Sequence, residues 1–442
     1  MTRTDPPLLR GLTRPRLSTP GLSAPCLRGS GLGALGRGPL GQGAPGPHAA
    51  ARRDFLRLAG LAGAGAALAA CGVEGQGGKQ KVTTSDVQKY WSGKARTGTL
   101  RWANWPGYIE DDRATLKAFE KATGIKVTYR EVIQETAQWF GRIQAPLSAG
   151  QSIGFDLMVM TNGIQLEKLR QLGHLAPLDH SRLPAFAANA GAEYKNPSYD
   201  PGNAFTIPYM SGITGIAYNT RYVKDEITSI AQLFDPKYKG RVGMMRDSQE
   251  LGSFGMFLLG VDPERSGPAD WRRAADRLRR QRDAGIVRKY YEQDYVDAVS
   301  KGDVWLTMAW SGDVYSLAGP DVEFVVPEEG GTLWTDNLCI PRTAENPVDA
   351  LVLMDYLYKP ENNAPLTEFI NYITPVPAVR PLIEAHAREA AGEEKADLER
   401  LGSSPLVFPA EADLKRLRHY RRLTQPEEAE YQKLFEPIPK GS

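Results

Sequence analysis

The stretch around which the chain is organised runs from Glu329 to Pro341 and reads EGGTLWTDNLCIP. Its Gly-Gly pair predicts a turn, and the residues that follow predict a strand that Pro341 ends. Trp334 and Asp336 lie two positions apart, so on a strand their side chains point to the same face. An indole face and a carboxylate on one face attract the same ammonium cation. For the pair taken alone, the alternative is a core Trp beside a surface Asp.

Length and composition limit the classes of protein to which the chain can belong. At 442 residues the chain is long enough for two domains, and 41% hydrophobic with 24% charged residues is typical of a soluble globular protein. Nine Arg, no Lys and two Asp give residues 1–70 a charge of +7, which leaves −5 for the remainder of a net +2. An acidic body does not attract phosphate overall, so we expect no nucleic-acid partner. The three cysteines and five histidines show no ligand spacing, and we expect no metal and no cofactor.

The N-terminal region predicts export. Residues 1–50 are rich in Gly, Pro and Arg without periodicity, and we expect a disordered leader there. Arg52 and Arg53 precede an apolar run of thirteen residues that is too short to span a membrane and that leads to Cys71. A charged segment followed by such a run is typical of a signal peptide, which we place at 51–71.

Two details of this signal resemble known export motifs. Arg52 and Arg53, followed by Phe-Leu, resemble twin-arginine signals, and Leu-Ala-Ala-Cys resembles a bacterial lipoprotein cleavage box. The second resemblance implies cleavage before Cys71 and a lipid on its sulfur. Residues 72–97 are rich in Gly, Lys, Thr and Ser and predict a flexible tether between this anchor and the body.

The body begins at Thr99 and alternates strands with helices. Strands are predicted at 99–103, 125–129 and 155–160, and helices at 111–123, 135–147 and 165–172. Such alternation indicates an α/β fold with a largely parallel sheet, in which ligands collect beyond the carboxyl ends of strands. The loops that hold Trp105 and Thr161 lie at such ends.

The second half of the body predicts further strands and one basic helix. Two extended segments with a Gly-rich bend between them are predicted at 204–219, and strands at 242–245 and 304–310. Asp247 follows one of these strands and is placed to cap the next helix. Helix 269–284 carries six Arg, which predict a solvated face, with contact to a lipid headgroup as the alternative.

Short motifs recur along the body in a characteristic order and spacing. They are Asn104-Trp105-x-x-Tyr108, Thr123-Gly124-Ile125-Lys126-Val127, Asp156-Leu157-x-Val159, Ile207-Pro208-Tyr209, Tyr238-Lys239-Gly240, Trp310-x-Gly312-Asp313, Glu329-Gly330-Gly331-x-x-Trp334-x-Asp336 and Tyr372-x-Thr374-Pro375. Together they resemble the periplasmic spermidine/putrescine-binding proteins of bacterial ABC importers. The resemblance implies a two-lobe periplasmic-binding-protein fold of type II, with a hinge and an interlobe ligand cleft. Its lobes would be 98–210 plus 337–375 and 211–336 plus 376–438.

The resemblance also implies that ten residues bind the ligand, and it implies a catalytic role for none. They are Trp105, Tyr108 and Thr161 on the first lobe, Asp247, Glu250, Trp310, Asp313 and Trp334 facing them, and Asp336 and Tyr372 completing the site. The Trp310-to-Asp313 motif resembles the putrescine-binding branch. The chain departs from the family at Gly107, where relatives often carry an acid, and at Gly163, where some carry a Tyr.

A polyamine is a flexible chain with an ammonium at each end, so its receptor needs separated carboxylates and flat apolar walls. We therefore predict a monomeric receptor, without enzymatic activity, that binds putrescine or spermidine and delivers it to an ABC permease served by a separate ATPase. We expect it to be exported and either anchored by a lipid on Cys71 to the outer face of the cytoplasmic membrane or located in the periplasm. The alternatives are the same fold with another amine, an amino acid derivative or an opine, and a carboxylate-dependent glycoside hydrolase.

Overall fold

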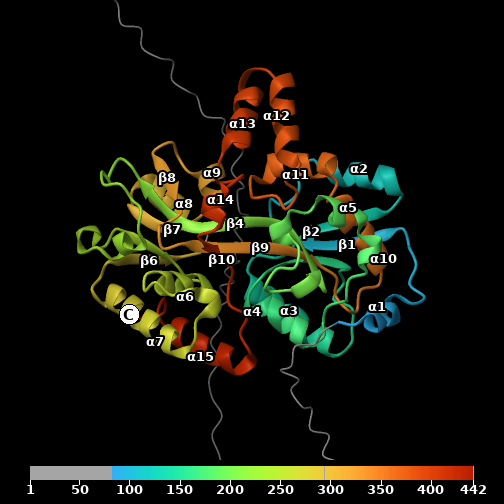
Figure 1. The fold of residues 1–442 in the computed structure, drawn as a ribbon, viewed down its shortest axis with the longest axis horizontal. Coiled ribbons are helices and arrows are strands. Elements are labelled where there is room, and N and C mark those ends of the chain that lie inside the picture. The colour runs from blue at the N-terminus through green and yellow to red at the C-terminus, as the bar shows by residue number, and fades with distance from the viewer. Residues whose placement is uncertain (1–81, 293, 442) are drawn as a thin grey trace, which may run out of the picture. The chain divides into compact units, whose positions relative to one another are not determined.

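Two long strands, β4 (Thr206–Asn219) and β9 (Gly331–Cys339), form the middle of the sheet. The computed structural model describes residues 82–292 and 294–441, so the predicted leader and export signal lie outside the described residues (Figure 1). The sheet has ten strands in the order β2-β1-β3-β9-β4-β7-β5-β6, with β10 beside β9 and β8 beside β4. Residues 331–339 of the Glu329–Pro341 stretch therefore form a central strand.

The half of the sheet on the β2 side follows the predicted alternation of strands and helices. Its first elements are β1 (Thr99–Asn104), α2 (Ala114–Thr123), β2 (Lys126–Glu131), α3 (Thr136–Ser148), β3 (Leu157–Thr161), α4 (Ile164–Gln171) and α5 (Pro184–Asn189). Strand β1 is parallel to β2 and β3, as predicted. Helix α2 begins three residues later than predicted, because Arg113 takes a left-handed φ of 58°.

The other half carries the second set of parallel strands. Its elements are β5 (Val242–Met245), α6 (Ser248–Phe257), α7 (Pro268–Asp283), β6 (Val287–Tyr291), α8 (Tyr295–Lys301), β7 (Leu306–Trp310), α9 (Ser311–Leu317) and β8 (Val322–Val325). Strand β5 is parallel to β6 and β7, and β4 is antiparallel to β7 and β8. Helix α9 was not predicted, because Ser311 and Gly312 favour a turn.

The prediction of a bend between 204 and 219 is wrong. Residues 206–219 form one continuous strand, β4, whose register with β9 runs from Thr206 opposite Cys339 to Thr214 opposite Thr332. Gly212 lies in the extended strand, where an added Cβ would stand 2.1 Å from the indole of Trp334. The glycine is there to admit a ring and not to turn the chain.

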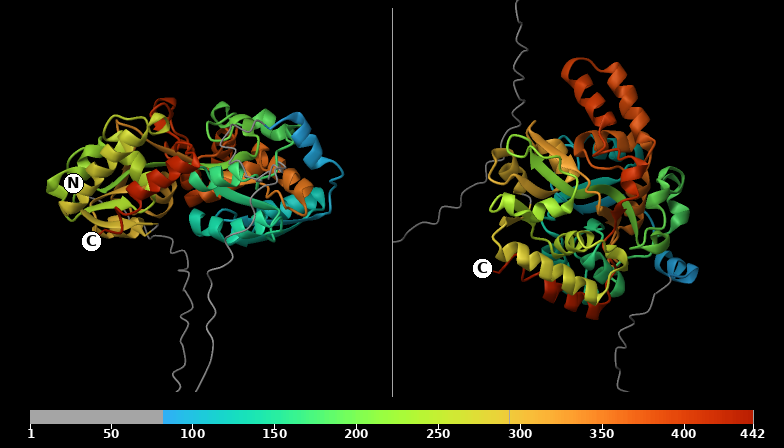
Figure 2. Two further views of the ribbon diagram at one scale, coloured as in Figure 1. Left: turned by 90° about the horizontal axis from the view of Figure 1, so that it is seen from below. Right: turned by 60° about the vertical axis from the view of Figure 1, so that its left-hand side comes forward.

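The C-terminal part is mostly helical. Its elements are α10 (Pro347–Tyr356), α11 (Pro360–Ile370), α12 (Val379–Glu389), α13 (Gly392–Ser403), α14 (Glu411–Leu414), β10 (Leu417–Arg418) and α15 (Gln425–Phe435). Helices α12 and α13 lie side by side (Figures 1 and 2). No helix within the described residues has the length and apolar content that crossing a bilayer requires.

Among the described residues, buried side chains gather in two large clusters and two smaller ones, and the first three of them define two lobes. The first cluster includes Trp102, Phe119, Leu351 and Ile383, and the third includes Trp139, Met158 and Leu169 on the β1–β3 side of the sheet. We call this part the first lobe. The second cluster includes Met244, Phe254, Trp271 and Phe435 and marks the second lobe.

The exact lobe boundaries stay a prediction, but the clusters indicate where the C-terminal helices belong. Ile383 of α12 and Leu401 of α13 pack in the first cluster, whereas Phe435 of α15 packs in the second. This packing places 376–408 with the first lobe, although the resemblance assigned 376–438 to the second. Strand β9 pairs with β3 of one half, β4 pairs with β7 of the other half, and the pairing of β4 with β9 joins the lobes.

The predicted tether differs from the structure where the two can be compared. Residues 84–91 form helix α1 (Thr84–Trp91), whose first turn is closed by a capping box of Thr83 and Asp86. Trp91 is buried in the first cluster, and its indole N–H donates to the carbonyl of Pro177 at 2.8 Å. Burial of Trp91, together with the hydrogen bonds from Tyr90 to the carbonyl of Arg342 and from Thr97 to Asp349, holds the segment against the body.

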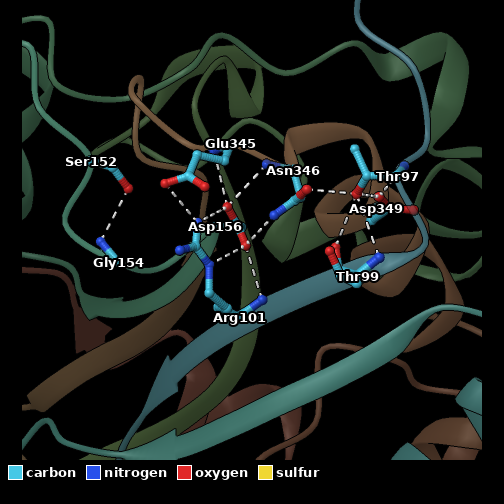
Figure 3. A network of polar contacts seen from close by, with 9 residues as sticks. All are labelled: Thr97, Thr99, Arg101, Ser152, Gly154, Asp156, Glu345, Asn346 and Asp349. Atoms are coloured by element: carbon cyan, nitrogen blue, oxygen red, sulfur yellow. Dashed lines mark hydrogen bonds and ion pairs between the residues drawn. The ribbon is translucent and has the colours of Figure 1, made fainter.

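A polar network fixes the edge of the first lobe (Figure 3). Asp156, which is buried, accepts from the Arg101 Nε at 3.1 Å and from the backbone N–H groups of Glu345 and Asn346 at 3.0 Å. Burial opposes ionisation, but the hydrogen bonds from Arg101 and Asn346 hold the pKa of Asp156 below its usual range. The network ties the start of β3 to β1 and to the entrance of α10.

Candidate ligand-binding site

Asp336 forms one end of the candidate site. It is 3% exposed and lies on β9 directly opposite Thr161 of β3, whose hydroxyl donates to Oδ1 at 2.5 Å. The hydroxyl of Tyr108 donates to Oδ2 at 2.6 Å. Burial raises the pKa of Asp336 to about 6, and the two hydrogen bonds oppose that rise. Both partners are neutral, so the negative charge is solvated by hydroxyl groups but not cancelled.

Trp334 lies on the same strand and forms a wall. Its ring meets Tyr372 edge-on at 5.1 Å between centroids and Trp310 at 6.3 Å. Its indole N–H is buried and has no hydrogen-bond partner among the described residues. Because Asp336 is as buried as Trp334, the alternative of a core Trp beside a surface Asp does not hold.

Asp313, in the first turn of α9, is the second acid. Its Oδ1 accepts from the hydroxyl of Tyr372 at 2.7 Å and its Oδ2 from the hydroxyl of Tyr295 at 2.9 Å. Burial raises its pKa, against the effect of both hydrogen bonds. An added Cβ at Gly312 would stand 2.3 Å from the Tyr372 ring, so the glycine gives that ring its place.

Glu250, on α6, is the third acid and is 2% exposed. Its Oε1 accepts from the hydroxyls of Thr214 and Tyr420 at 2.6 and 2.7 Å and from the indole N–H of Trp310 at 3.1 Å. Its Oε2 is buried and has no hydrogen-bond partner among the described residues. Burial raises the pKa of Glu250 to about 7. One oxygen is thus held in place and the other is left to accept from a further donor.

Asp247 and Trp105 are less closely tied to these acids. Asp247 is exposed and accepts from the backbone N–H groups of Gln249 and Glu250 at 2.8 and 3.0 Å, which confirms the predicted cap on α6. Trp105 packs against the first cluster, and its buried indole N–H finds no hydrogen-bond partner in the described part of the chain. Within the described ranges, Trp105 shares no hydrogen bond or ring contact with the other predicted site residues.

The remaining predicted residues form one connected arrangement. Tyr108, bound to Asp336, and Tyr372, bound to Asp313, have ring centroids 6.3 Å apart. Trp310 links the rings to Glu250 and packs against both the first and the second cluster. The structure therefore places acids at two ends and aromatic rings between them, where the two lobes meet.

Sequence reasoning missed three hydroxyl donors of this site. Thr214, Tyr295 and Tyr420 hold the acids, and each comes from a different segment, 36, 18 and 170 residues from its partner along the chain. No local sequence pattern identifies them. Thr214 could have been identified only from the position of β4 between β9 and β7 in the sheet. In the described part of the chain, no group of three His, Cys, Asp or Glu residues could hold a metal ion.

Two lobes joined by long shared strands, with acids and aromatic rings at their junction, define a hinged solute-binding protein. The model of the bacterial extracellular solute-binding proteins matches residues 114–392, which is more than half of the chain. The chain belongs to this family.

Individual relatives agree with this assignment. The spermidine/putrescine-binding periplasmic protein of Escherichia coli (strain K12) is 31% identical over 288 residues, which cover 64% of this chain and 80% of the relative. The putrescine-binding periplasmic protein PotF of the same organism is 31% identical over 321 residues, covering 67% and 83%. The solved structure of the spermidine/putrescine ABC transporter substrate-binding protein PotD from Streptococcus pneumoniae has a TM-score of 0.64 at 24% identity, covering 77% and 98%. That structure supports the two-lobe fold.

Proposed function

We propose that this protein binds a polyamine, putrescine or spermidine, and delivers it to the permease of an ABC importer. The observation that carries the proposal is the set of three buried acids Asp336, Asp313 and Glu250. Within the described residues, each of them accepts hydrogen bonds from neutral groups and none forms an ion pair.

Buried carboxylates without a cation are costly, because neither water nor a positive charge compensates them. An ammonium group supplies both the charge and up to three donors. Glu250 Oε2 is the acceptor left open for such a donor. In a ligand with two ammonium groups, one group would bind Asp336 and the other would bind Asp313 or Glu250.

The aromatic rings support a ligand with a methylene chain. Tyr108, Trp310, Trp334 and Tyr372 lie between the acids, and rings of this kind pack against methylenes while attracting the charged ends. The names of the two Escherichia coli relatives, one for spermidine and putrescine and one for putrescine, support the same class of ligand.

A different amine bound in the same site is the second candidate. The acids and rings suit ammonium groups joined by methylenes, but they do not select one length of the methylene chain. Anionic opines fit the acids poorly, because like charges repel. The family is one of solute-binding proteins and not of hydrolases, so we assign no catalysis to the three acids.

We further propose that the protein is exported and held at the membrane by a lipid on Cys71, with Arg52 and Arg53 in its export signal. A monomeric receptor that meets a permease with a separate ATPase is the assembly that this proposal implies.

A thermal-shift panel tests the ligand class. Putrescine, spermidine and cadaverine should raise the melting temperature, and γ-aminobutyrate and glucose should not. At 100 times its dissociation constant a ligand stabilises by about 2.7 kcal/mol. A clear shift with an anionic compound and none with any amine would overturn the proposal.

A further inference from the structure

Helix α4 belongs to the first lobe but its first turn touches the second. Leu166 and Leu169 pack in the third cluster with Met158 of β3. Ile164, at the start of the same helix, packs in the second cluster with the residues of α6 and α7. The helix therefore spans the boundary between the lobes.

A hydrogen bond from a backbone N–H to a side chain joins this first turn to α6. The N–H of Ile164 donates to Oε1 of Gln249 at 2.9 Å, and Gln249 is buried. Gly163 has a φ of 136°, a region that favours glycine, and an added Cβ there would stand 2.5 Å from the same Oε1. The absence of a side chain at Gly163 is what lets Gln249 reach the helix end.

Two ion pairs extend the contact. Glu167 Oε2 lies 3.2 Å from Arg422 Nε, and Lys168 Nζ lies 2.6 Å from Glu428 Oε1 on α15. Both glutamates are buried. Leu423, next to Arg422, and Tyr431 of α15 pack in the second cluster, so the partners of α4 belong to the second lobe.

The contact lies next to the candidate site on both sides. Thr161, which binds Asp336, precedes Gly163 by two residues, and Gln249 stands between Asp247 and Glu250. Separating the lobes here would pull the Asp336 end of the site away from the Glu250 end.

We propose that the contacts of α4 with Gln249, Arg422 and Glu428, here named the α4 latch, close the binding site and set how long the ligand stays bound. This rests on the proposed function. The latch is made of polar contacts, which can break and reform as the lobes move. Its residues are positioning residues: among the described residues, none of them forms a hydrogen bond or ion pair with the side chains of Asp336, Asp313 or Glu250. Weakening the latch should therefore speed ligand release and leave association nearly unchanged.

A charge swap on the full protein tests the latch. Lys168→Glu and Glu428→Lys each place like charges opposite one another, and the double variant restores an ion pair in reverse. We expect the release rate of putrescine, followed by tryptophan fluorescence in stopped flow, to rise about tenfold in each single variant and to return to within about threefold of wild type in the double variant.

Glu430→Lys is the matched control. Glu430 lies on α15 beside Glu428 but pairs with Arg272 of α7, within the second lobe, at 2.6 Å. It makes the same charge change without touching α4, so release should stay at the wild-type rate. Unchanged release in both single variants, or an equal effect of Glu430→Lys, would overturn the latch.

A readout without ligand separates the latch from the proposed function. If wild-type protein binds neither putrescine nor spermidine, the proposed function fails, and X-ray scattering then tests the latch alone. The single variants should show a larger radius of gyration than wild type, and the double variant should recover it. Equal radii in all of these proteins would overturn the latch.

Discussion

The indole ring of Trp334 lies against Gly212, the residue directly opposite it on β4. An added Cβ would stand 2.1 Å from Cζ2 of the ring, well inside van der Waals contact. The indole of Trp334, one wall of the candidate site, thus packs across β4 and β9, the two strands that join the lobes. This packing requires a glycine at position 212.

Replacing that glycine should move the wall. Gly212→Ala forces the indole away from Tyr372, and we expect the affinity for putrescine to fall about tenfold or more and the stability to fall by about 1–3 kcal/mol. Calorimetric titration and urea unfolding measure the two effects. Gly141→Ala in α3, where an added Cβ meets nothing within 4 Å, is the control and should leave the affinity unchanged. Unchanged binding in Gly212→Ala would show that the ring position is unimportant.

The stability of the ligand-free protein should rise as the pH falls from about 8 to about 5. Burial raises the pKa of Glu250 from 4.5 to about 7 and that of Asp336 from 3.8 to about 6. In this window the folded protein binds more protons than the unfolded chain. The stabilisation from protonated Glu250 and Asp336 is therefore present at low pH and is lost as the pH rises through their pKa values in the folded protein.

Glu250→Gln isolates this effect, because other groups titrate in the same window. We expect the variant to lose about 1–3 kcal/mol of the pH dependence between these limits, measured by urea unfolding. Glu430→Gln, on the surface of α15, is the control. An identical pH dependence in wild type and Glu250→Gln would contradict a raised pKa at Glu250.

Ligand affinity should change in the opposite direction. An ammonium group binds the ionised acids, so protonation of Glu250 and Asp336 competes with it as the pH falls below about 7. We expect putrescine to bind more weakly at pH 5 than at pH 8, by about tenfold or more, in calorimetric titrations. Affinity that rises toward low pH would argue against acid-mediated binding.

Lipid attachment is predicted for Cys71, outside the described residues. Radiolabelled palmitate should be incorporated into the wild-type protein in a bacterial host and not into Cys71→Ala. Cys339→Ala is the control, because Cys339 is buried and should not affect labelling. Labelling that survives Cys71→Ala would refute the anchor.

Sequence reasoning worked where a motif or a period marks the residues. The alternation around β1 to β3 predicted parallel strands with helices between them, and the Trp334–Asp336 pair was placed on a strand. It failed where the deciding contact is distant. Tyr420 reaches Glu250 from a segment with no pattern of its own, and Trp91 holds α1 in a stretch whose composition favours a tether.

Glycines misled the prediction for a physical reason. At Gly212 the residue admits an indole in an extended strand, whereas composition alone favours a bend. At Gly163, where the family resemblance suggested only a missing Tyr contact, the glycine makes room for Gln249. A single sequence does not distinguish a glycine required for backbone conformation from one required for the close approach of another side chain.

The central claim is that buried acids without a cationic partner bind an amine, and Asp336 tests it most directly. Calorimetric titration of putrescine and of spermidine into wild type, Asp336→Asn and the exposed control Asp297→Asn gives the comparison. We expect binding to wild type and to the control, and an affinity at least about tenfold lower, on the order of 1.4 kcal/mol, for Asp336→Asn. Equal affinity of Asp336→Asn and wild type for both amines would contradict the role of this acid in amine binding.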